Sequence, residues 1–128
     1  MEPLFISGTN NTPTVKFDGV QGIIEITGRS NPENSIAFFK PLMDWLEEYF
    51  NSPAALTNVN IKLEYFNTSS SKFILNILKK LELISKNKNE VKINWYYQNG
   101  DEDMLEAAND YESLIQIPFY IIASENMA

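Results

Sequence analysis

Apolar and polar residues alternate in two short segments near the start of the chain, Thr14 to Phe17 and Ile23 to Thr27. Alternation with a period of two is typical of strands that bury one face. The loop between these segments, Asp18-Gly19-Val20-Gln21-Gly22, contains glycines, which a tight connection favours. We therefore predict a β-hairpin in this part of the chain.

Apolar residues at helical spacing predict a first helix after this hairpin. It opens at Asn31-Pro32-Glu33, where Asn suits the cap, Pro the first turn and Glu the positive end of the helix dipole. The helix is predicted to run to about Phe50. Pro41 lies inside it and removes one backbone hydrogen bond, so we expect either a kink or a later helix start. The residues predicted to face the core are Phe39, Leu42, Met43, Leu46, Tyr49 and Phe50.

Two more helices are predicted by the same spacing. The second starts in the hydroxyl run Thr68-Ser69-Ser70-Ser71 and ends near Ser85. The third opens at Asp101-Glu102-Asp103, and acidic residues in a first turn are favoured by the helix dipole. The apolar residues expected to be buried in these two helices are Ile74, Ile77, Leu78, Leu81, Met104, Leu105, Ala108, Tyr111, Leu114 and Ile115.

Three further strands are predicted at Val59 to Phe66, Val91 to Tyr97 and Ile117 to Ala123. The first of them carries the alternating residues Ile61, Leu63 and Tyr65, and the last contains Pro118, which suggests an edge position or a bulge. The order β-β-α-β-α-β-α-β predicts an α/β fold: an N-terminal hairpin, then helices alternating with strands in a mixed, mostly parallel sheet with right-handed crossovers. The length predicts one domain over residues 1–128.

Polar residues follow two of these strands at the point where each strand ends. In sheets of this kind, ligand and partner sites gather beyond the carboxyl ends of the strands. We therefore expect Asn67 and Thr68 to lie on the same edge as Asp101, Glu102 and Asp103.

The chain contains no cysteine and no histidine, and its net charge is −7. A thiol nucleophile, the commonest general base and the commonest metal ligand are therefore excluded. The negative charge argues against nucleic acid and anionic membranes as partners. No GxGxxG, Walker-type, HExxH or GxSxG motif occurs, and no cofactor is predicted. We find no secretory signal and no apolar run of about 20 residues, so we expect a cytoplasmic protein without membrane insertion.

The acidic stretch Asp101-Glu102-Asp103 has two interpretations. Its carboxylates could hold a divalent cation through oxygen ligands. Consecutive residues of a helix point in different directions, however, so they make a poor ligand set. A solvated first turn that matches the helix dipole is the favoured interpretation, and no metal is predicted.

The run of four hydroxyls at residues 68–71 also has two interpretations. Hydroxyls cap helices because they accept hydrogen bonds from unpaired backbone N–H groups. The same place suits a phosphate, because free N–H groups and the helix dipole both favour an anion. Capping preferences alone favour the cap.

The arrangement of short motifs along nearly the whole chain is informative. They are Thr12-Pro13, Phe17-Asp18, Gly28, Asn31-Pro32-Glu33-Asn34, Phe39, Pro41-Leu42, Glu64-Tyr65-Phe66-Asn67-Thr68-Ser69-Ser70-Ser71-Lys72, Trp95-Tyr96-Tyr97, Asp101-Glu102-Asp103-Met104 and Pro118-Phe119. In this arrangement the chain resembles the SiaC family of regulatory phosphoproteins, small relatives of the STAS domains of anti-sigma factor antagonists. The Asn-Thr-Ser-Ser segment after a strand is the most specific of these motifs.

The resemblance implies a STAS-like, partner-switching protein without catalysis of its own. In this family a cognate kinase phosphorylates a threonine after the third strand, and a metal-dependent serine/threonine phosphatase reverses the reaction. The unmodified form binds and activates a diguanylate cyclase, which raises cyclic di-GMP. By position the threonine is Thr68, which we expect to be both a cap and a switch. Ser69, Ser70 and Ser71 are secondary candidates for phosphorylation or capping, and Asn67, Asp101, Glu102 and Asp103 are candidate partner contacts.

Two other functions compete with this one. An anti-sigma factor antagonist that binds an anti-sigma kinase would use a hydroxyl at the start of the same helix. A small metal-dependent hydrolase would use the acidic stretch, but the absence of histidine and cysteine disfavours it.

Overall fold

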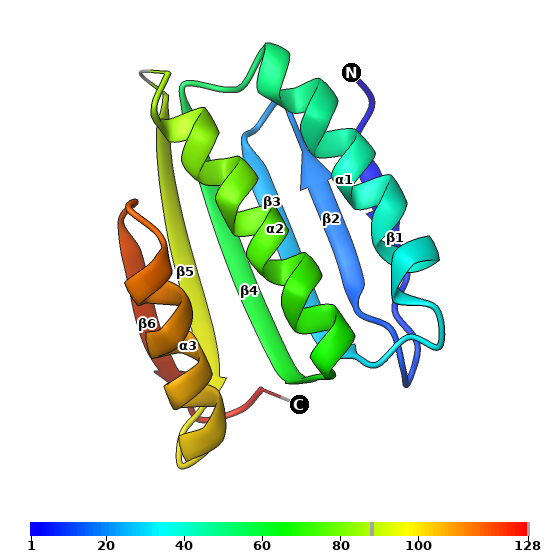
Figure 1. Ribbon diagram of the computed structural model, residues 1–128, viewed down its shortest axis with the longest axis vertical. Helices are drawn as coiled ribbons and strands as arrows, with labels where there is room; N and C mark the ends of the chain where they lie inside the picture. Colours follow the sequence, from blue (N-terminus) through cyan, green and yellow to red (C-terminus); the bar gives the residue numbers. More distant parts are fainter. Residues whose placement is uncertain (88, 128) are drawn as a thin grey trace.

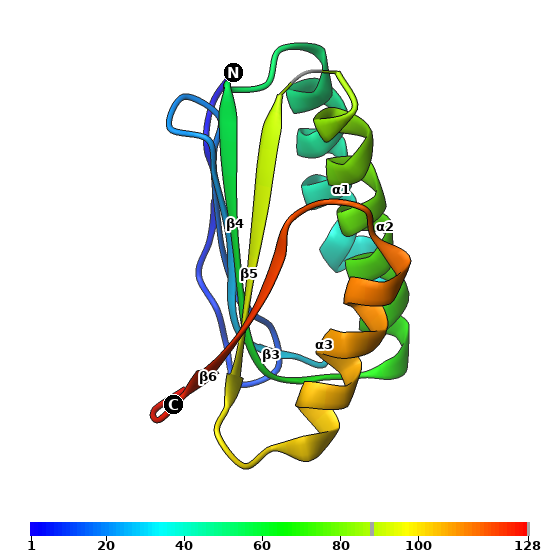
Figure 2. The same cartoon turned by 90° about the vertical axis from the view of Figure 1, so that its left-hand side faces the viewer.

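The computed structural model describes residues 1–87 and 89–127. Within these ranges, six strands form one sheet in the order β1-β2-β3-β4-β5-β6, and three helices lie on one of its faces (Figures 1 and 2). The strands are β1 (Leu4–Ile6), β2 (Thr14–Asp18), β3 (Ile23–Ser30), β4 (Leu56–Phe66), β5 (Glu90–Gln98) and β6 (Phe119–Ser124). The helices are α1 (Ser35–Asn51), α2 (Thr68–Ser85) and α3 (Glu102–Leu114).

The sheet is mixed and mostly parallel, as predicted. β2 pairs antiparallel with β1 and β3, whereas β3, β4, β5 and β6 pair with one another in parallel. Strand β1 was not predicted, because three residues are too few for a period of two to emerge. β6 is an edge strand, which is one of the two outcomes predicted from Pro118. Pro118 lies just before the strand, and its carbonyl accepts a hydrogen bond from the Ile93 N–H at 3.0 Å.

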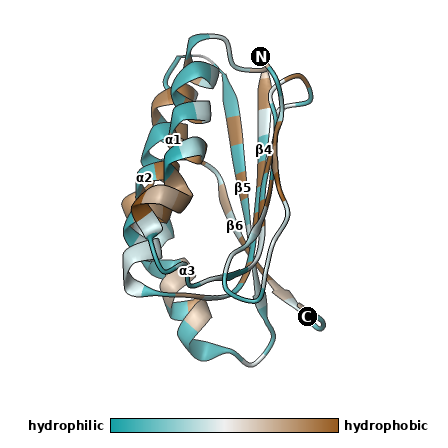
Figure 3. Cartoon of the chain, turned by 90° about the vertical axis from the view of Figure 1, so that its right-hand side faces the viewer, coloured by the Kyte–Doolittle hydropathy of each residue, from teal (hydrophilic) through white to brown (hydrophobic). Residues whose placement is uncertain are grey.

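The core lies between the sheet and the helices. Figure 3 shows that hydrophilic and hydrophobic residues alternate along the strands, and that the helices also carry stretches of both kinds. Four fully buried side chains from successive strands form its floor: Phe17, Ile24, Ile61 and Trp95. Most of the predicted helix residues cover them. Leu105 is only half-buried, and Leu114 is half exposed because α3 ends there. Ile115 is buried as predicted, although it follows the helix with an extended backbone.

A register shift near the end of β4 corrects the predicted alternation. Gly28 of β3 lies opposite Leu63, but the next residue, Arg29, lies opposite Tyr65. Gly28 has φ +115, a conformation that glycine adopts readily. Glu64 is thus an extra residue in β4, and it turns Tyr65 outward. The Arg29 guanidinium lies over the Tyr65 ring, 5.1 Å from its centroid. Phe66 packs against the core in its place.

Helix α1 starts later than its sequence indicated. Its cap is Asn34, whose Oδ1 accepts from the Ala37 N–H at 3.1 Å, so the predicted cap at Asn31 is wrong. Pro32 and Glu33 therefore precede the helix. Pro41 lies inside this helix, so a start late enough to leave the proline outside, one of the two outcomes expected from Pro41, is not what the structure shows.

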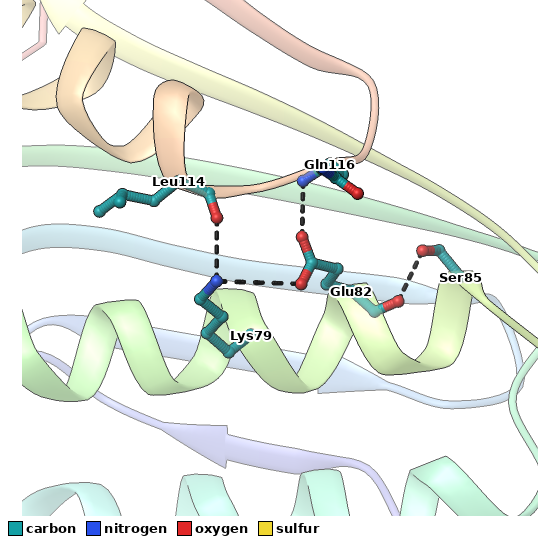
Figure 4. A network of polar contacts seen from close by, with 5 residues as sticks. All are labelled: Lys79, Glu82, Ser85, Leu114 and Gln116. Carbon is teal, nitrogen blue, oxygen red and sulfur yellow. Dashed lines mark hydrogen bonds and ion pairs between the residues drawn. The ribbon is translucent and has the colours of Figure 1, made fainter.

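A polar network joins α2 to the end of α3 and to the connection between α3 and β6 (Figure 4). The buried carboxylate of Glu82 accepts a hydrogen bond from the Gln116 N–H at 2.6 Å and lies 3.9 Å from the Lys79 ammonium. Lys79 also donates to the Leu114 carbonyl at 2.9 Å. Glu82 thus satisfies a backbone donor at the connection between α3 and β6 and fixes where this connection lies.

We predict that Glu82→Ala lowers the free energy of unfolding by about 1–3 kcal/mol, because it leaves the Gln116 N–H without its acceptor. Glu48→Ala, at an exposed position of α1, is the matched control and should stay within about 0.5 kcal/mol of wild type. Urea denaturation followed by circular dichroism measures both. Equal losses in the two variants would contradict the structural role given to Glu82.

Candidate functional site

The start of all three helices lies at one edge of the sheet (lower edge in Figure 1). β3 ends at Ser30 shortly before α1, β4 ends at Phe66 directly before α2, and β5 ends at Gln98 shortly before α3. Because these three strands are parallel, their carboxyl ends share this edge. Thr68 and the acidic stretch at 101–103 therefore lie on the same edge, as the sequence predicted.

Asn67 caps α2. Its Oδ1 accepts a hydrogen bond from the Ser70 N–H at 2.8 Å, and its backbone N–H donates to the Ser30 carbonyl at 2.9 Å. Its side-chain amide also donates to Asn31 Oδ1 at 3.0 Å. The expectation that Thr68 is itself the cap is therefore wrong, because Thr68 is the first residue inside the helix. Asn67 is a structural residue at the centre of the site.

Each of the three serines of the hydroxyl run has a partner. Ser70 is buried, and its hydroxyl contacts Ser30 Oγ at 2.8 Å and donates to the Ser30 carbonyl at 3.2 Å. The Ser69 hydroxyl lies 2.6 Å from Ser35 Oγ at the start of α1. Ser71 Oγ donates to the Thr68 carbonyl at 2.6 Å. These hydroxyls hold the first turn of α2 in place.

Thr68 differs from the serines that follow it. Its side chain is exposed, and no hydrogen bond within residues 1–87 and 89–127 involves its hydroxyl. The hydroxyl therefore lies on a turn that is held by hydrogen bonds of its neighbours, and it has no structural role of its own. This geometry suits a group that is modified without loss of the fold.

The acidic stretch divides into two parts. Asp101 is half-buried and caps α3, since its Oδ1 accepts from the Met104 N–H at 3.1 Å. Glu102 and Asp103 are exposed in the first turn. In the part of the chain that the structure describes, no three acidic side chains gather in a way that could hold a metal ion. Asp101 is structural, and Glu102 and Asp103 supply a negative surface.

The first turns of the helices differ in charge. That of α3 carries Glu102 and Asp103, whereas those of α1 and α2 carry no acidic residue. The positive ends of the α1 and α2 dipoles are thus left without a charged partner in their own first turns.

Tyr111 joins α3 to the first turn of α2. Its hydroxyl donates to the Ser71 carbonyl at 2.9 Å, and its ring packs on Trp95 with centroids 5.2 Å apart. Burial raises the pKa of Tyr111 to about 12, so the hydroxyl remains a proton donor at neutral pH. The sequence predicted a core position for Tyr111 but not this polar contact.

The site also contains residues that the sequence did not assign to it. Ser30, Asn31 and Ser35 contact the hydroxyl run or its cap from 34 to 40 positions away in the chain. These contacts cannot be predicted from the spacing of residues along the chain, because they depend on the parallel pairing of β3 with β4. Asn31 was assigned to a helix cap and instead supports Asn67.

Comparison with known proteins agrees with this arrangement. Residues 6–124 match the family described as SiaC family regulatory phosphoprotein. A relative from Pseudomonas aeruginosa (strain UCBPP-PA14), itself called uncharacterized, is 32% identical over 125 residues, 98% of this chain and 99% of the relative. The chain belongs to the SiaC family of regulatory phosphoproteins, as its motifs indicated.

Solved structures show the same fold. The structure of SiaC of Pseudomonas aeruginosa is 31% identical, with a TM-score of 0.89 over 97% of this chain and 100% of that one. A crystal structure of the diguanylate cyclase SiaD in complex with its activator SiaC, also from Pseudomonas aeruginosa, matches at 32% identity. Its TM-score is 0.89, over 94% of this chain and 99% of that chain.

None of the described helices is long and apolar enough to cross a membrane.

We predict that Asn67→Ala lowers the free energy of unfolding by about 1 kcal/mol, because the α2 cap is lost. Thr68→Ala should change it by less than about 0.5 kcal/mol, because the Thr68 hydroxyl is exposed and holds no partner. Thermal or urea denaturation of the two neighbouring variants measures the difference. A larger loss for Thr68→Ala than for Asn67→Ala would contradict the assignment of the cap.

Proposed function

We propose that this chain is a partner-switching protein without catalysis of its own, acting in the cytoplasm. Its unmodified form binds and activates a diguanylate cyclase and so raises cyclic di-GMP. A cognate kinase phosphorylates Thr68 and ends this binding, and a metal-dependent serine/threonine phosphatase restores it. The observation that carries the proposal is the exposed Thr68 hydroxyl, which has no hydrogen-bond partner among the described residues and lies on a hydrogen-bonded first turn, in a chain that belongs to a family of regulatory phosphoproteins.

The cyclase is favoured as the partner by the relatives. SiaC of Pseudomonas aeruginosa, which is 32% identical to this chain over nearly its full length, has been crystallised as the activator bound to the cyclase SiaD. This observation favours a cyclase over the anti-sigma kinase that the hydroxyl run alone left open.

Thr68 is favoured over the serines by its surroundings. Phosphate on Ser70 would need space in a buried site. Phosphate on Ser69 would break its 2.6 Å contact with Ser35 of α1, and phosphate on Ser71 would break its 2.6 Å hydrogen bond to the Thr68 carbonyl. Phosphate on Thr68 adds charge to an exposed group and breaks no contact among the described residues. Ser69, Ser70 and Ser71 are therefore secondary sites at most.

The energies involved suit a switch at this position. A phosphate at a helix N-terminus gains about 0.3–1 kcal/mol from the dipole, so the fold tolerates it. In an interface that buries Thr68 the same group carries roughly −1.5 to −2 charges, and desolvating an unpaired ion costs several kcal/mol. A loss of about 3–4 kcal/mol weakens binding by two to three orders of magnitude. This releases a partner held at micromolar affinity or tighter.

We predict that phosphorylation of Thr68 weakens cyclase affinity at least about a hundredfold, in line with this cost. Thr68→Ala should keep wild-type affinity after treatment with the kinase, and Thr68→Asp should bind weakly, because one carboxylate imitates a dianionic phosphate imperfectly. Calorimetry with the purified cyclase, cyclic di-GMP output and phosphopeptide mapping form the test. Phosphorylated protein that binds and activates the cyclase like unmodified protein would overturn the proposal. Stoichiometric phosphate on a serine, with Thr68 unmodified, would overturn the assignment of Thr68 as the phosphorylated residue.

We also predict that the acidic stretch contributes to partner binding through its charge. Replacing Asp101, Glu102 and Asp103 by Asn, Gln and Asn should alter cyclase affinity and its dependence on salt while leaving the fold intact, because Asn still caps α3. The matched control replaces Asp44, Glu47 and Glu48, three exposed acids of α1, in the same way. Affinity that stays unchanged at low and moderate salt, or that changes equally in the control, would count against this role.

A further inference from the structure

The connection between β5 and α3 contains the dipeptide Asn99-Gly100 and lies beyond the sheet, at the edge that carries Thr68 (Figures 1 and 2). Both of its residues are exposed. The Asp101 N–H donates to the Gln98 carbonyl at 2.9 Å, and Gly100 has φ +94, so these four residues form a tight turn whose third position needs a positive φ. Because glycine has no side chain to shield its nitrogen, this nitrogen is open to the side-chain amide of the preceding asparagine.

The backbone nitrogen of Gly100 is free to react. Within residues 1–87 and 89–127 its N–H forms no hydrogen bond, whereas the N–H groups of its neighbours Asn99 and Asp101 are each bonded at 2.9 Å. A side-chain carbon at residue 100 would meet no atom within 4 Å. Solvent therefore reaches this nitrogen, and no structural bond has to break before it attacks.

Two other asparagines precede a small residue, serine, and both are held more firmly. Asn34 caps α1, with its Oδ1 accepting from the Ala37 N–H at 3.1 Å. Asn51 is the last residue of α1, and the N–H of Ser52 that follows donates to the Tyr49 carbonyl at 3.1 Å. The attack of a following nitrogen is therefore favoured at Asn99 over these two positions.

We propose that Asn99 is a site of spontaneous deamidation. The Gly100 nitrogen attacks Cγ of Asn99, so that a new C–N bond closes a cyclic imide. The bond between Cγ and Nδ2 breaks, and ammonia leaves with the proton of the Gly100 N–H. Water then opens the imide at one of its two carbonyls and gives aspartate or isoaspartate. Water is the only co-reactant, and no group is oxidised or reduced.

The Glu125 side chain restrains this reaction. Its Oε1 accepts a hydrogen bond from Asn99 Nδ2 at 3.0 Å, which holds the amide that has to leave. Glu125→Ala removes this bond and keeps the hydrogen bond that the Glu125 carbonyl accepts from Gln98 Nε2 at 3.0 Å. We therefore expect Asn99 to deamidate faster in Glu125→Ala than in wild type.

Either product changes the edge that carries the acidic stretch. A carboxylate replaces a neutral amide two residues before Asp101, the cap of α3, and close to the exposed Glu102 and Asp103. Isoaspartate also lengthens the main chain by a methylene group inside the turn, which displaces the start of α3. The consequence for the partner rests on the proposed function, whereas the modification itself does not.

Incubation of the full-length protein at mildly alkaline pH tests the modification. Peptide mass spectrometry locates the converted residue, and an isoaspartyl methyltransferase assay detects isoaspartate. Asn99 should convert before Asn34 and Asn51, and faster as the pH rises, because the attacking nitrogen has to lose its proton. Gly100→Ala should slow the conversion at least about tenfold, since a methyl group hinders the nitrogen. Circular dichroism verifies that each variant is folded.

Three results would count against the proposed chemistry. Conversion of Asn34 or Asn51 before Asn99 would overturn the site. A rate that Gly100→Ala leaves unchanged would overturn the attack by the following nitrogen. Equal rates in wild type and Glu125→Ala would overturn the restraint by Glu125.

Cyclase affinity tests the consequence separately. Asn99→Asp reproduces one product and should change the affinity about two- to fivefold, in the direction opposite to that of neutralising the acidic stretch. Asn99→Gln keeps the amide and is the matched control, which should bind like wild type. Equal affinities of Asn99→Asp and wild type would overturn the effect on the partner and leave the deamidation standing. Absence of wild-type binding would overturn the proposed function and this effect, while mass spectrometry still decides the deamidation.

Discussion

A buried contact of 2.8 Å between the hydroxyls of Ser30 and Ser70 holds the first turn of α2 against the end of β3. Around it, Asn67 caps the helix and receives support from Asn31, while Ser69 reaches Ser35 at the start of α1. These bonds satisfy the polar groups that a helix start leaves unpaired, and they are possible only because β3 and β4 run in parallel. In the resulting turn, the neighbours of Thr68 form all of these hydrogen bonds, and the Thr68 hydroxyl stays exposed at a fixed place. The proposed phosphorylation of Thr68 would therefore not compete with the bonds that hold the turn.

The edge that carries this turn is divided by charge. Two helix starts without first-turn acids lie beside Lys72, and the third carries Glu102 and Asp103. A partner that covers this edge meets an electropositive part and an electronegative part, which fixes its orientation as well as its affinity. Phosphate on Thr68 would add negative charge to the first part and so make it resemble the second. The proposed switch thus uses a change in surface charge, and the sheet beneath serves as a constant support.

The sequence predicted what depends on local periodicity and missed what depends on pairing. The alternation and the helical spacing predicted five of the strands, all three helices and the common edge of Thr68 and Asp101, and the motifs predicted the family. Caps were less predictable, because several residues near each helix start can accept the same N–H groups; Asn34 and Asn67 do so here in place of Asn31 and Thr68. The outward position of Tyr65 was not predicted, because a bulge in β4, opposite Gly28 and Arg29, changes which side chains face the core. Contacts such as Ser30 with Ser70 have no local signal at all.

We propose that phosphorylation changes the charge of this edge and leaves the fold unchanged. Amide hydrogen exchange of the isolated protein before and after stoichiometric phosphorylation of Thr68 tests it most directly, because it reports local opening at each amide. We expect unchanged protection in β4, β5 and the body of α2, with differences confined to the first turn of α2 and its contacts at Ser30 and Ser35. Loss of protection that spreads along α2 and into the sheet would mean that the switch acts by unfolding, and would contradict a switch that acts by charge.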